Sequence, residues 1–553
     1  MLVEALERRV QNLVLLTLLG MTLVVTPWMN LDPINLPKYL TLVVTGLALL
    51  GNLAPYLKQL VGAELRMLVA GVLSFLLALI VVFFVHIGAA NQLHGAYGRN
   101  TGFFSYAALA MILLAVVFVS NRGFLSRVLN VLVLTGVFNA GYGLMQWAGL
   151  DPVNWNNPYN PIVGTLGNPN FTSAHLGIAA LASLALMLGG VSFGVGALLG
   201  FNILLSLFVI YQSDSSQGLL VFALGAGVLG YLRFLRRNLI LGSIYLFGFA
   251  STIVVGVIGI LNKGPLASYL YQDSVTYRGD YWRAGWKMTV ENPLFGVGLD
   301  SYGDWYRFYR NEAAALRRGP DVTSNSAHNV FLDISSNGGF LLLLTYLLII
   351  GLIFRSAVRI VIRSNGYDAI SAGLVVSWLA YLIQSVISIN QLGLAIWGWV
   401  LGGAIIGYDI FKDRSGTPKV KRNPGKRSEQ VPAKVVVSGA LGLVLGVLVS
   451  IWPVAQDVSF RSALSGGDAT RFVEVANGFP GNTYYFNYAS DVLLKNKLED
   501  QALDMTRKSI ALNPRDFNAW KLLIANPKLD EAERQKSILE MKKLDPFNNT
   551  LGE

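Results

Sequence analysis

The residues best suited to chemistry lie in one polar stretch, from Tyr277 to Gly339, between long apolar segments. This stretch is rich in arginine and runs into Ser326–Asn329, where a segment long enough to cross a membrane begins. A guanidinium group binds two phosphate oxygens at once, and a neutral imidazole accepts a proton. Arg278 and His328 are therefore the candidate catalytic residues, suited to an anionic substrate at the edge of a bilayer.

The spacing around Arg278 places further candidates on one helix. A helix is expected at Asp280–Val290, because Pro293 disfavours α geometry in the residue before it. Arg278, Trp282 and Trp286 recur every four residues and therefore share a face. A cation beside indole rings suits a phosphate and a sugar, but the same pattern is typical of an interfacial helix anchored by tryptophans. Spacing alone leaves both interpretations open.

The position of His328 bears on its protonation. Ser324, Asn325 and Ser326 are good N-cap residues, so His328 is expected in the first turn of the following span. The positive end of the helix dipole disfavours imidazolium there and leaves a neutral ring able to accept a proton. The alternative is a histidine that only forms hydrogen bonds at the membrane interface.

Other polar residues are candidates for binding substrate. With Trp282, they are Arg283, Gln217, Asp214 and Asn329. Asp214 lies in a short turn between two apolar segments, where a carboxylate can orient an acceptor or cap a helix, and the cap is favoured. The glycine-punctuated segment Leu294–Leu299 lacks the strand and the full pattern of a dinucleotide motif, so we interpret it as architectural.

A metal site is not predicted. His86, His94 and His175 fall on or near the face that carries His328, but neither an H-E-x-x-H motif nor a cysteine is present. The histidines are also spread over several connections. We therefore expect a site without metal or cofactor.

The composition indicates the elements that position these residues. Of 553 residues, 53% are hydrophobic and 14% charged, which excludes a soluble globular protein. An all-α polytopic bundle of about thirteen spans is predicted, since about 20 helical residues cross the hydrocarbon. The predicted spans begin near Val10, Tyr39, Met67, Phe103, Val128, Phe171, Val191, Gly218, Leu239, Asn329, Ala369, Leu392 and Val435. The absence of cysteine excludes disulfides.

The basic residues predict the orientation. The net charge is +11, but the positive charges cluster in alternate short connections, so they indicate topology and not a nucleic-acid partner. This predicts that the N-terminus is cytoplasmic and that both the 262–327 loop and the C-terminal tail lie on the extracytoplasmic face of the membrane. Acidic residues nearly balance the arginines of that loop, which predicts that it is folded.

Four segments follow from this topology. They are a membrane domain at 1–411, a basic cytoplasmic linker at 412–434, a last span at 435–455 and an extracytoplasmic helical domain at 456–553. Within the last of these, Ala502–Trp520 is similar to the second helix and turn of a tetratricopeptide repeat. Such repeats need neighbours to bury their faces, so a protein partner or the membrane domain is expected to complete the stack.

Several motifs recur together in one known superfamily. They are Gly164–Asn170, Ser216-Gln217-Gly218, Tyr277–Trp282, Asn292–Gly298, His328–Leu332 and Gly338-Gly339. In their order and their placement on one face, they resemble the O-antigen ligase and polymerase superfamily of bacterial envelope glycosyltransferases. The resemblance covers roughly residues 10 to 410.

The resemblance implies a GT-C-type, metal-independent, inverting enzyme of the bacterial plasma (inner) membrane. It would move a glycan from a polyprenyl diphosphate carrier to a hydroxyl of a glycan, lipid or protein acceptor. Carried over, Arg278 holds the diphosphate and His328 deprotonates the acceptor. Where the family often has Ser-Arg-Gly, this chain has Gln217, so one expected arginine is missing. Arg283, Arg307 and Lys263 are the candidate substitutes.

Two other functions are weighed against this one. A transporter or flippase of a lipid-linked or small anionic substrate is compatible with many spans, but such proteins usually contain inverted repeats, and none is evident here. A non-catalytic envelope scaffold has no need of arginine, tryptophan and histidine concentrated in one outer loop.

Overall fold

The protein is described from a computed structural model that covers residues 4–60, 62–155, 157, 160–236, 238–415, 431–467 and 469–552. Within these ranges the chain is 77% helix and has no strand. Among the described residues, 11 helices are long and apolar enough to cross a membrane. The predicted all-α polytopic bundle is thereby confirmed. Of the predicted linker, residues 416–430 lie outside the described part.

The apolar helices correspond to the predicted spans. They are α2 (Asn35–Leu53), α4 (Arg66–Val85), α6 (Arg122–Trp147), α7 (Pro169–Met187), α8 (Phe193–Gln212), α9 (Ser216–Gly230), α10 (Leu239–Ile260), α15 (Val330–Arg363), α16 (Ala369–Ile387), α17 (Leu392–Ser415) and α18 (Ala433–Gly466). The two remaining predicted spans are also helices of the bundle. Of these, α5 (Phe103–Val119) is shorter, and α1 (Glu4–Leu23) carries charged residues in its first turns.

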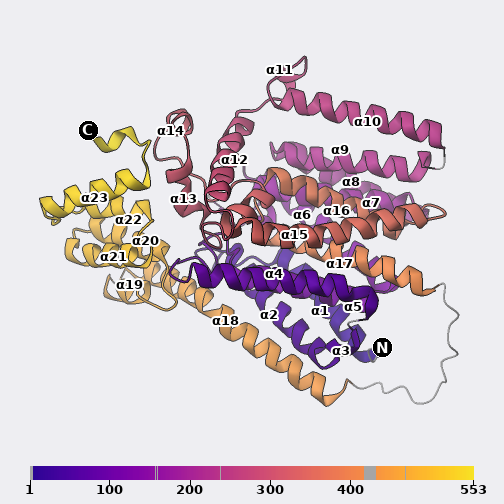
Figure 1. The fold of residues 1–553 in the computed structure, drawn as a ribbon, viewed down its shortest axis with the longest axis horizontal. Coiled ribbons are helices and arrows are strands. Elements are labelled where there is room, and N and C mark those ends of the chain that lie inside the picture. Colours follow the sequence, from indigo (N-terminus) through magenta and orange to yellow (C-terminus); the bar gives the residue numbers. More distant parts are fainter. Residues whose placement is uncertain are drawn as a thin grey trace.

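Small residues allow the helices to approach each other closely. This is usual in membranes, because an apolar side chain gains little free energy when it moves from lipid to a helix interface. A Cβ added at Gly442 or Gly446 of α18 would overlap the backbone of α2, so the two helices touch directly. Gly218 of α9 similarly lies against the carbonyl of Ser173 in α7. Helix α17 is almost entirely buried, whereas α10 is mostly exposed and lies at the edge of the bundle (Figure 1).

The loop of residues 262–327 (the outer loop) is folded, as its balanced charge predicted. It contains α11 (Ala267–Leu270), α12 (Asp273–Glu291), α13 (Tyr302–Tyr309) and α14 (Glu312–Arg318). The ring-bearing side chains of Tyr281, Tyr302, Tyr306 and Tyr309 form its core together with Met288. In Figure 1 these helices lie at the same end of the bundle as the C-terminal helices, and the N-terminus lies at the opposite end.

The glycine-punctuated segment after α12 is architectural, as predicted. Helix α15 is broken at Gly339, where φ is +66°. The backbone N–H of Val297 donates to the carbonyl of Ser336 (2.8 Å), that of Gly298 to Asn337 (3.0 Å), and that of Phe340 to Pro293 (2.7 Å). The segment therefore satisfies backbone groups that the break would leave unpaired.

The C-terminal domain is a run of short helices that begins where α18 ends. They are α19 (Ala469–Ala476), α20 (Thr483–Lys495), α21 (Glu499–Leu512), α22 (Phe517–Ala525) and α23 (Glu531–Leu544). Shorter turns elsewhere are α3 (Leu57–Leu60), η1 (Ala54–Tyr56), η2 (Ala63–Leu65), η3 (Gly164–Leu166), η4 (Tyr231–Leu235) and η5 (Asn549–Gly552). Helix α18 continues through Pro453, so one helix joins the last span to this domain.

The outer loop covers one end of this helical domain. The carboxylate of Asp545 is fully buried and pairs with Arg307 (2.9 Å) and Arg310 (2.5 Å). The guanidinium of Arg515 lies 3.3 Å from the ring centroid of Trp305. Contacts within the same chain therefore supply a neighbour for the stack, which was one of the two expected possibilities.

A second buried carboxylate, Asp457 of α18, ties the domain to the bundle. It accepts hydrogen bonds from Asn30 Nδ2 (3.0 Å), the backbone N–H groups of Leu31 (2.6 Å) and Asp32 (3.2 Å), and the hydroxyl groups of Tyr97 (2.8 Å) and Tyr485 (2.9 Å). The donors come from the turn between α1 and α2, from an outer connection and from α20. One side chain thus joins three segments.

Replacing Asp457 with alanine is expected to destabilise the folded protein by about 3 kcal/mol or more, because buried donors lose a charged acceptor. Thermal unfolding of the detergent-purified protein, together with limited proteolysis of the C-terminal domain, measures the effect. Asp491→Ala is the control, since Asp491 forms only an exposed pair with Lys495 (2.6 Å). Equal melting temperatures for the two variants would show that the Asp457 contacts contribute little.

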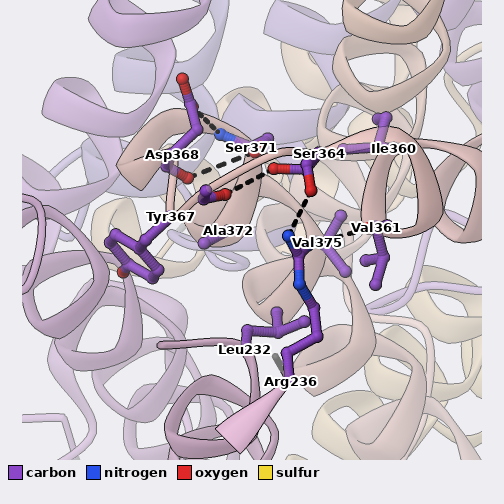
Figure 2. Close-up of a pocket in the computed structure, with 11 residues that line it drawn as sticks. Leu232, Arg236, Ile360, Val361, Ser364, Tyr367, Asp368, Ser371, Ala372 and Val375 are labelled. Carbon is purple, nitrogen blue, oxygen red and sulfur yellow. Dashed lines mark hydrogen bonds between the residues drawn. The ribbon is translucent and has the colours of Figure 1, made fainter. Parts of the chain in front are cut away.

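A small pocket lies at the other end of α15. Figure 2 shows Arg236 reaching the end of that helix, where it donates to the carbonyls of Val361 (2.8 Å) and Ser364. A cation at a helix C-terminus satisfies orphan carbonyls. The cavity is about 20 Å³, roughly what one or two waters need. It has a structural role and lies far along α15 from His328.

Candidate active site

The helix that follows His328 begins later than predicted. Asn329 is its N-cap, and Asn329 Oδ1 accepts from the backbone N–H groups of Phe331 (3.0 Å) and Leu332 (3.1 Å). The prediction that Ser324–Ser326 cap the helix, with His328 in its first turn, is wrong. His328 precedes the cap in the left-handed region, with φ of +52°. Few residues other than glycine and asparagine adopt this backbone conformation readily, so the position is specialised.

The serines are engaged in the His328 loop itself. Ser326 Oγ donates to Asp333 Oδ2 (2.7 Å) and accepts from the backbone N–H of His328 (3.0 Å). The backbone N–H of Ala327 also donates to Asp333 (2.8 Å). The carboxylate of Asp333, one turn inside α15, therefore holds the loop through two hydrogen bonds. The hydroxyl of Ser326 bonds to Asp333 and is therefore not the cap of the helix.

Arg99 anchors the same loop and was missed by sequence reasoning. Its guanidinium donates to the carbonyl of Asn325 (2.6 Å) and pairs with Asp300 (3.1 Å) and Asp333 (3.6 Å). Arg99 is buried. The available signal was an arginine in a connection that the charge pattern predicts to be extracytoplasmic, where positive charge is disfavoured. Its partners lie more than two hundred positions away along the chain.

Helix α12 packs against His328. The helix begins at Asp273, earlier than predicted, so Arg278 lies within it. The ring of Tyr281 stacks on His328, with the centroids 5.1 Å apart. Trp282 Nε1 lies 3.5 Å from the carbonyl oxygen of His328. Arg278 is one turn before Trp282, on the side of α12 that meets this loop.

The predicted face of Arg278, Trp282 and Trp286 divides into two parts. Arg278 and Trp282 are half-buried, whereas Trp286 is 54% exposed and contacts Phe340 of α15. The two interpretations of the spacing therefore apply to different residues: Trp286 has the exposure of an interfacial anchor, and Trp282 lies at the site.

The electrostatics favour an uncharged imidazole. The pKa of His328 is lowered from 6.5 to about 3, first by burial and then by the positive charges of Arg278, Arg99 and Arg318. Burial also lowers the pKa of Arg278 from its ordinary value. No carboxylate pairs with Arg278 in the described part of the chain, and its buried Nε has no hydrogen-bond partner there. An unneutralised cation thus lies beside a neutral base.

Helix α12 and the His328 loop fall within a segment that matches a known protein family. Residues 201–347 match the family model of O-antigen ligase. The match runs from α8 into α15 and contains α12, the outer loop and His328. It confirms the resemblance to the O-antigen ligase superfamily, which performs glycan transfer in the synthesis of cell-envelope polysaccharide. No curated protein matches the chain.

Three other cations in the matched segment were the predicted substitutes for the missing arginine, and the two arginines among them are already paired. Arg283 is 60% exposed in its side chain and pairs with Asp280 (3.3 Å), which also pairs with Arg317. Arg307 is held by Asp545 and does not fit the predicted role of a substitute cation. Lys263 lies in the exposed turn after α10.

Arg318 is the remaining cation near the histidine. It lies at the end of α14, donates to the hydroxyl of Tyr281 and stacks over the ring of Tyr277 (4.4 Å to the centroid). No ion pair involves it in the described residues. Sequence reasoning missed Arg318 because its closeness to His328 depends on how α14 folds back over α12.

Gln217 and Asp214 lie at the start of α9. Gln217 is buried, and its Oε1 has no hydrogen-bond partner among the described residues. Ser216 accepts from Gln272 at the beginning of α12 (3.2 Å), so this edge adjoins the helix that carries Arg278. The favoured interpretation of Asp214 as a cap is wrong, because Ser215 is the N-cap and Asp214 accepts from Asn160 (2.9 Å).

The other histidines have separate surroundings. His94 bonds the hydroxyl of Tyr39 (2.7 Å), His86 lies near the carbonyl of Val82 (3.1 Å), and His175 is buried beside Trp397. Within the described ranges, no three acidic or histidine side chains gather as a metal-binding group.

Proposed function

We propose that the protein transfers a glycan from a polyprenyl diphosphate carrier to an acceptor hydroxyl at the outer face of the bacterial plasma membrane. The observation that carries the proposal is the neutral His328 beside Arg278, a cation that has no carboxylate partner among the described residues, inside a segment that matches the O-antigen-ligase model. Chemistry on a diphosphate needs both groups: one removes a proton, and the other stabilises a departing anion.

The proposed reaction has a single displacement. His328 accepts the proton of the acceptor hydroxyl, whose oxygen attacks the anomeric carbon of the donor sugar. The bond from that carbon to the diphosphate oxygen breaks, and the electron pair leaves with the polyprenyl diphosphate. Attack opposite the leaving group inverts the anomeric centre. Every step uses side chains of this chain, so transfer is expected to continue in the presence of a chelator.

The proposed orientation follows the charge distribution. With the N-terminus in the cytoplasm, the outer loop and the C-terminal domain lie together on the external side, where Figure 1 shows them at one end of the bundle. The site then opens at the level of the headgroups, where the diphosphate of a membrane-bound donor resides.

We further propose that Arg318 supplies the second cation that Gln217 does not provide. Arg318→Gln is expected to reduce transfer by about tenfold to a hundredfold, since it removes one charge-assisted contact to the departing diphosphate. Arg317→Gln, at the adjacent position but paired with Asp280, is the matched control. Steady-state transfer by the purified variants measures the difference, and equal rates would remove Arg318 from the mechanism.

The test of the function itself uses the purified full-length protein in lipid nanodiscs. It is supplied with the lipid-linked glycan of the producing cell and with acceptor candidates, and both glycan transfer and released polyprenyl diphosphate are measured. Stoichiometric release and transfer support the proposal. Movement of intact donor across proteoliposomes without release would support the flippase alternative instead. Profiling the envelope glycans of a deletion strain identifies the acceptor.

A further inference from the structure

A polar cavity lies beside the His328 loop and has no part in the mechanism above. Its volume is about 170 Å³, whereas a single water needs only about 10–15 Å³. Its lining comes from the connections at the same end of the bundle as the outer loop and includes Asn35, Arg99, Asn168, Phe171, Asn390 and Gln391. The cavity is therefore large enough for a ligand.

The motif Gly164–Asn170 builds one wall of this cavity. Gly167 has φ of +78°, and a Cβ there would overlap Ile34, so the turn requires glycine. Asn168 caps α7 with its Oδ1, which accepts from the backbone N–H of Asn170 (2.9 Å). Its Nδ2 donates no hydrogen bond within the described part of the chain. The motif thus presents a rigid amide with a free donor.

The chemistry of the lining suits a neutral polyol. Amide side chains both donate and accept hydrogen bonds, as sugar hydroxyl groups do, and Phe171 offers an apolar ring face. Arg99 is the only charged side chain in the described lining, and it is already neutralised by Asp300 and Asp333. A diphosphate would find no free cation there, whereas an uncharged sugar would find the Nδ2 donor of Asn168. The amide of Asn390 already bonds the hydroxyl groups of Tyr106 (3.2 Å) and Tyr381 (3.3 Å). The amide of Gln391 bonds Asn35 (3.5 Å) and the backbone N–H of Leu394 (3.2 Å), so these two amides offer a sugar their second hydrogen and second lone pair.

The cavity is also coupled to the catalytic loop. Arg99 lines the cavity on one side and donates to Asn325 on the other, while its partner Asp333 holds Ser326 and Ala327. The Arg99–Asp333 ion pair therefore lies between the cavity and the loop residues that position His328. A ligand in the cavity would lie next to the reacting groups.

We infer that this cavity is a subsite for an uncharged sugar residue of the glycan that the protein handles, held mainly by the Asn168, Asn390 and Gln391 amides. The inference rests on the proposed function, since it assigns a substrate contact to the same site. It gives the Gly164–Asn170 motif a binding role that is separate from the diphosphate contacts of Arg278 and Arg318.

Two substitutions probe the cavity without disturbing the backbone. Asn168→Asp keeps the helix cap but removes the amide donor. Gly98→Asn adds a side chain at the cavity rim, where φ is +77° and nothing lies within 4 Å of an added Cβ, and asparagine tolerates this conformation. Gly149→Asn is the matched control, with φ of +71° and equally open surroundings outside the lining.

The probe is the free oligosaccharide released by mild acid from the lipid-linked glycan, and its binding to the nanodisc-embedded protein is measured by saturation-transfer NMR. Asn168→Asp is expected to weaken binding by about tenfold, the loss of roughly one good hydrogen bond. Gly98→Asn is expected to weaken it by a similar factor, because the added side chain takes up space at the cavity rim, while Gly149→Asn binds like the wild type. In the transfer assay, the KM for the glycan substrate rises by a similar factor and kcat changes little.

The outcomes separate the two proposals. Wild-type affinity and KM in both cavity variants would overturn the subsite, even if transfer proceeds normally. Absence of any transfer by the wild type, with oligosaccharide binding still lost in the two variants, would overturn the proposed function and leave the sugar site in place. A defect in Gly149→Asn equal to that in Gly98→Asn would show that the loss is not specific to the cavity.

Discussion

Replacing His328 with asparagine is expected to lower the rate of glycan transfer by about 10²- to 10⁴-fold, the usual contribution of a general base. The substitution removes the proton acceptor but retains a residue that tolerates a φ of +52°. The loop therefore keeps its shape, held as it is by Asp333 and Arg99. Binding of the lipid-linked donor should change little, because the proposed diphosphate contacts, Arg278 and Arg318, lie on α12 and α14.

The control for this variant is His86→Asn. His86 lies at the same end of the bundle, and its ring contacts the carbonyl of Val82 in its own helix (3.1 Å). Transfer by this variant should equal that of the wild type. If His328→Asn retained a rate within a few-fold of wild type, His328 would be a structural residue of the loop and another group would have to take the proton.

The pH dependence provides a separate check on the same residue. Because the pKa of His328 is lowered to about 3, the ring of the free enzyme is unprotonated throughout the neutral range. The value of kcat/KM for the wild type should therefore show no acid limb from this histidine between pH 5 and pH 8, and activity should fall only as the pH approaches about 3. Activity falls on the acid side because a protonated imidazole can no longer accept the proton of the acceptor hydroxyl.

The fold was predictable because the bilayer imposes strong constraints on sequence. Apolar runs of span length and basic connections are local signals, so each predicted span corresponds to a helix. Asn292-Pro293 likewise predicted the end of α12 correctly, because the restriction imposed by proline is local.

The site was only partly predictable, because its missing members are brought in by long-range contacts. Arg278 and His328 were predicted from residue type and spacing, and the structure places α12 against the His328 loop. Arg99 and Arg318 reach that loop only after the outer connections fold over the bundle. The N-cap was misassigned because the hydroxyl of Ser326 bonds to Asp333 and that of Ser324 bonds to the carbonyl of Ser326, and the sequence does not show which partner each serine takes.

The same reasoning explains why Arg307 was a poor substitute for the missing arginine. Its guanidinium forms an ion pair with Asp545, a fully buried residue of the C-terminal domain. A buried carboxylate needs a paired cation, so this arginine is committed to holding the two parts together. Several arginines of the outer loop are already paired with carboxylates, so fewer cations remain to bind a substrate than the sequence suggests.

Replacing Arg278 with glutamine is expected to reduce transfer by about 10²- to 10³-fold, the loss usually seen when one group that stabilises developing negative charge is removed. Arg278→Lys should recover only part of the rate, because an ammonium group cannot bind two phosphate oxygens in one plane. The matched control is Lys287→Gln on the same helix, since Lys287 is exposed and lies 3.8 Å from Glu291.

The Arg278 variant also has a consequence that distinguishes a cation at the site from a merely structural residue. The positive charge of Arg278 is the largest contribution, after burial, to the lowered pKa of His328. Its removal should raise that pKa toward 6.5, so the residual activity of Arg278→Gln acquires an acid limb at higher pH than in the wild type. The kcat/KM profile from pH 4 to pH 8 measures this shift. A reduced rate with an unchanged profile would mean that Arg278 acts at a distance from the histidine.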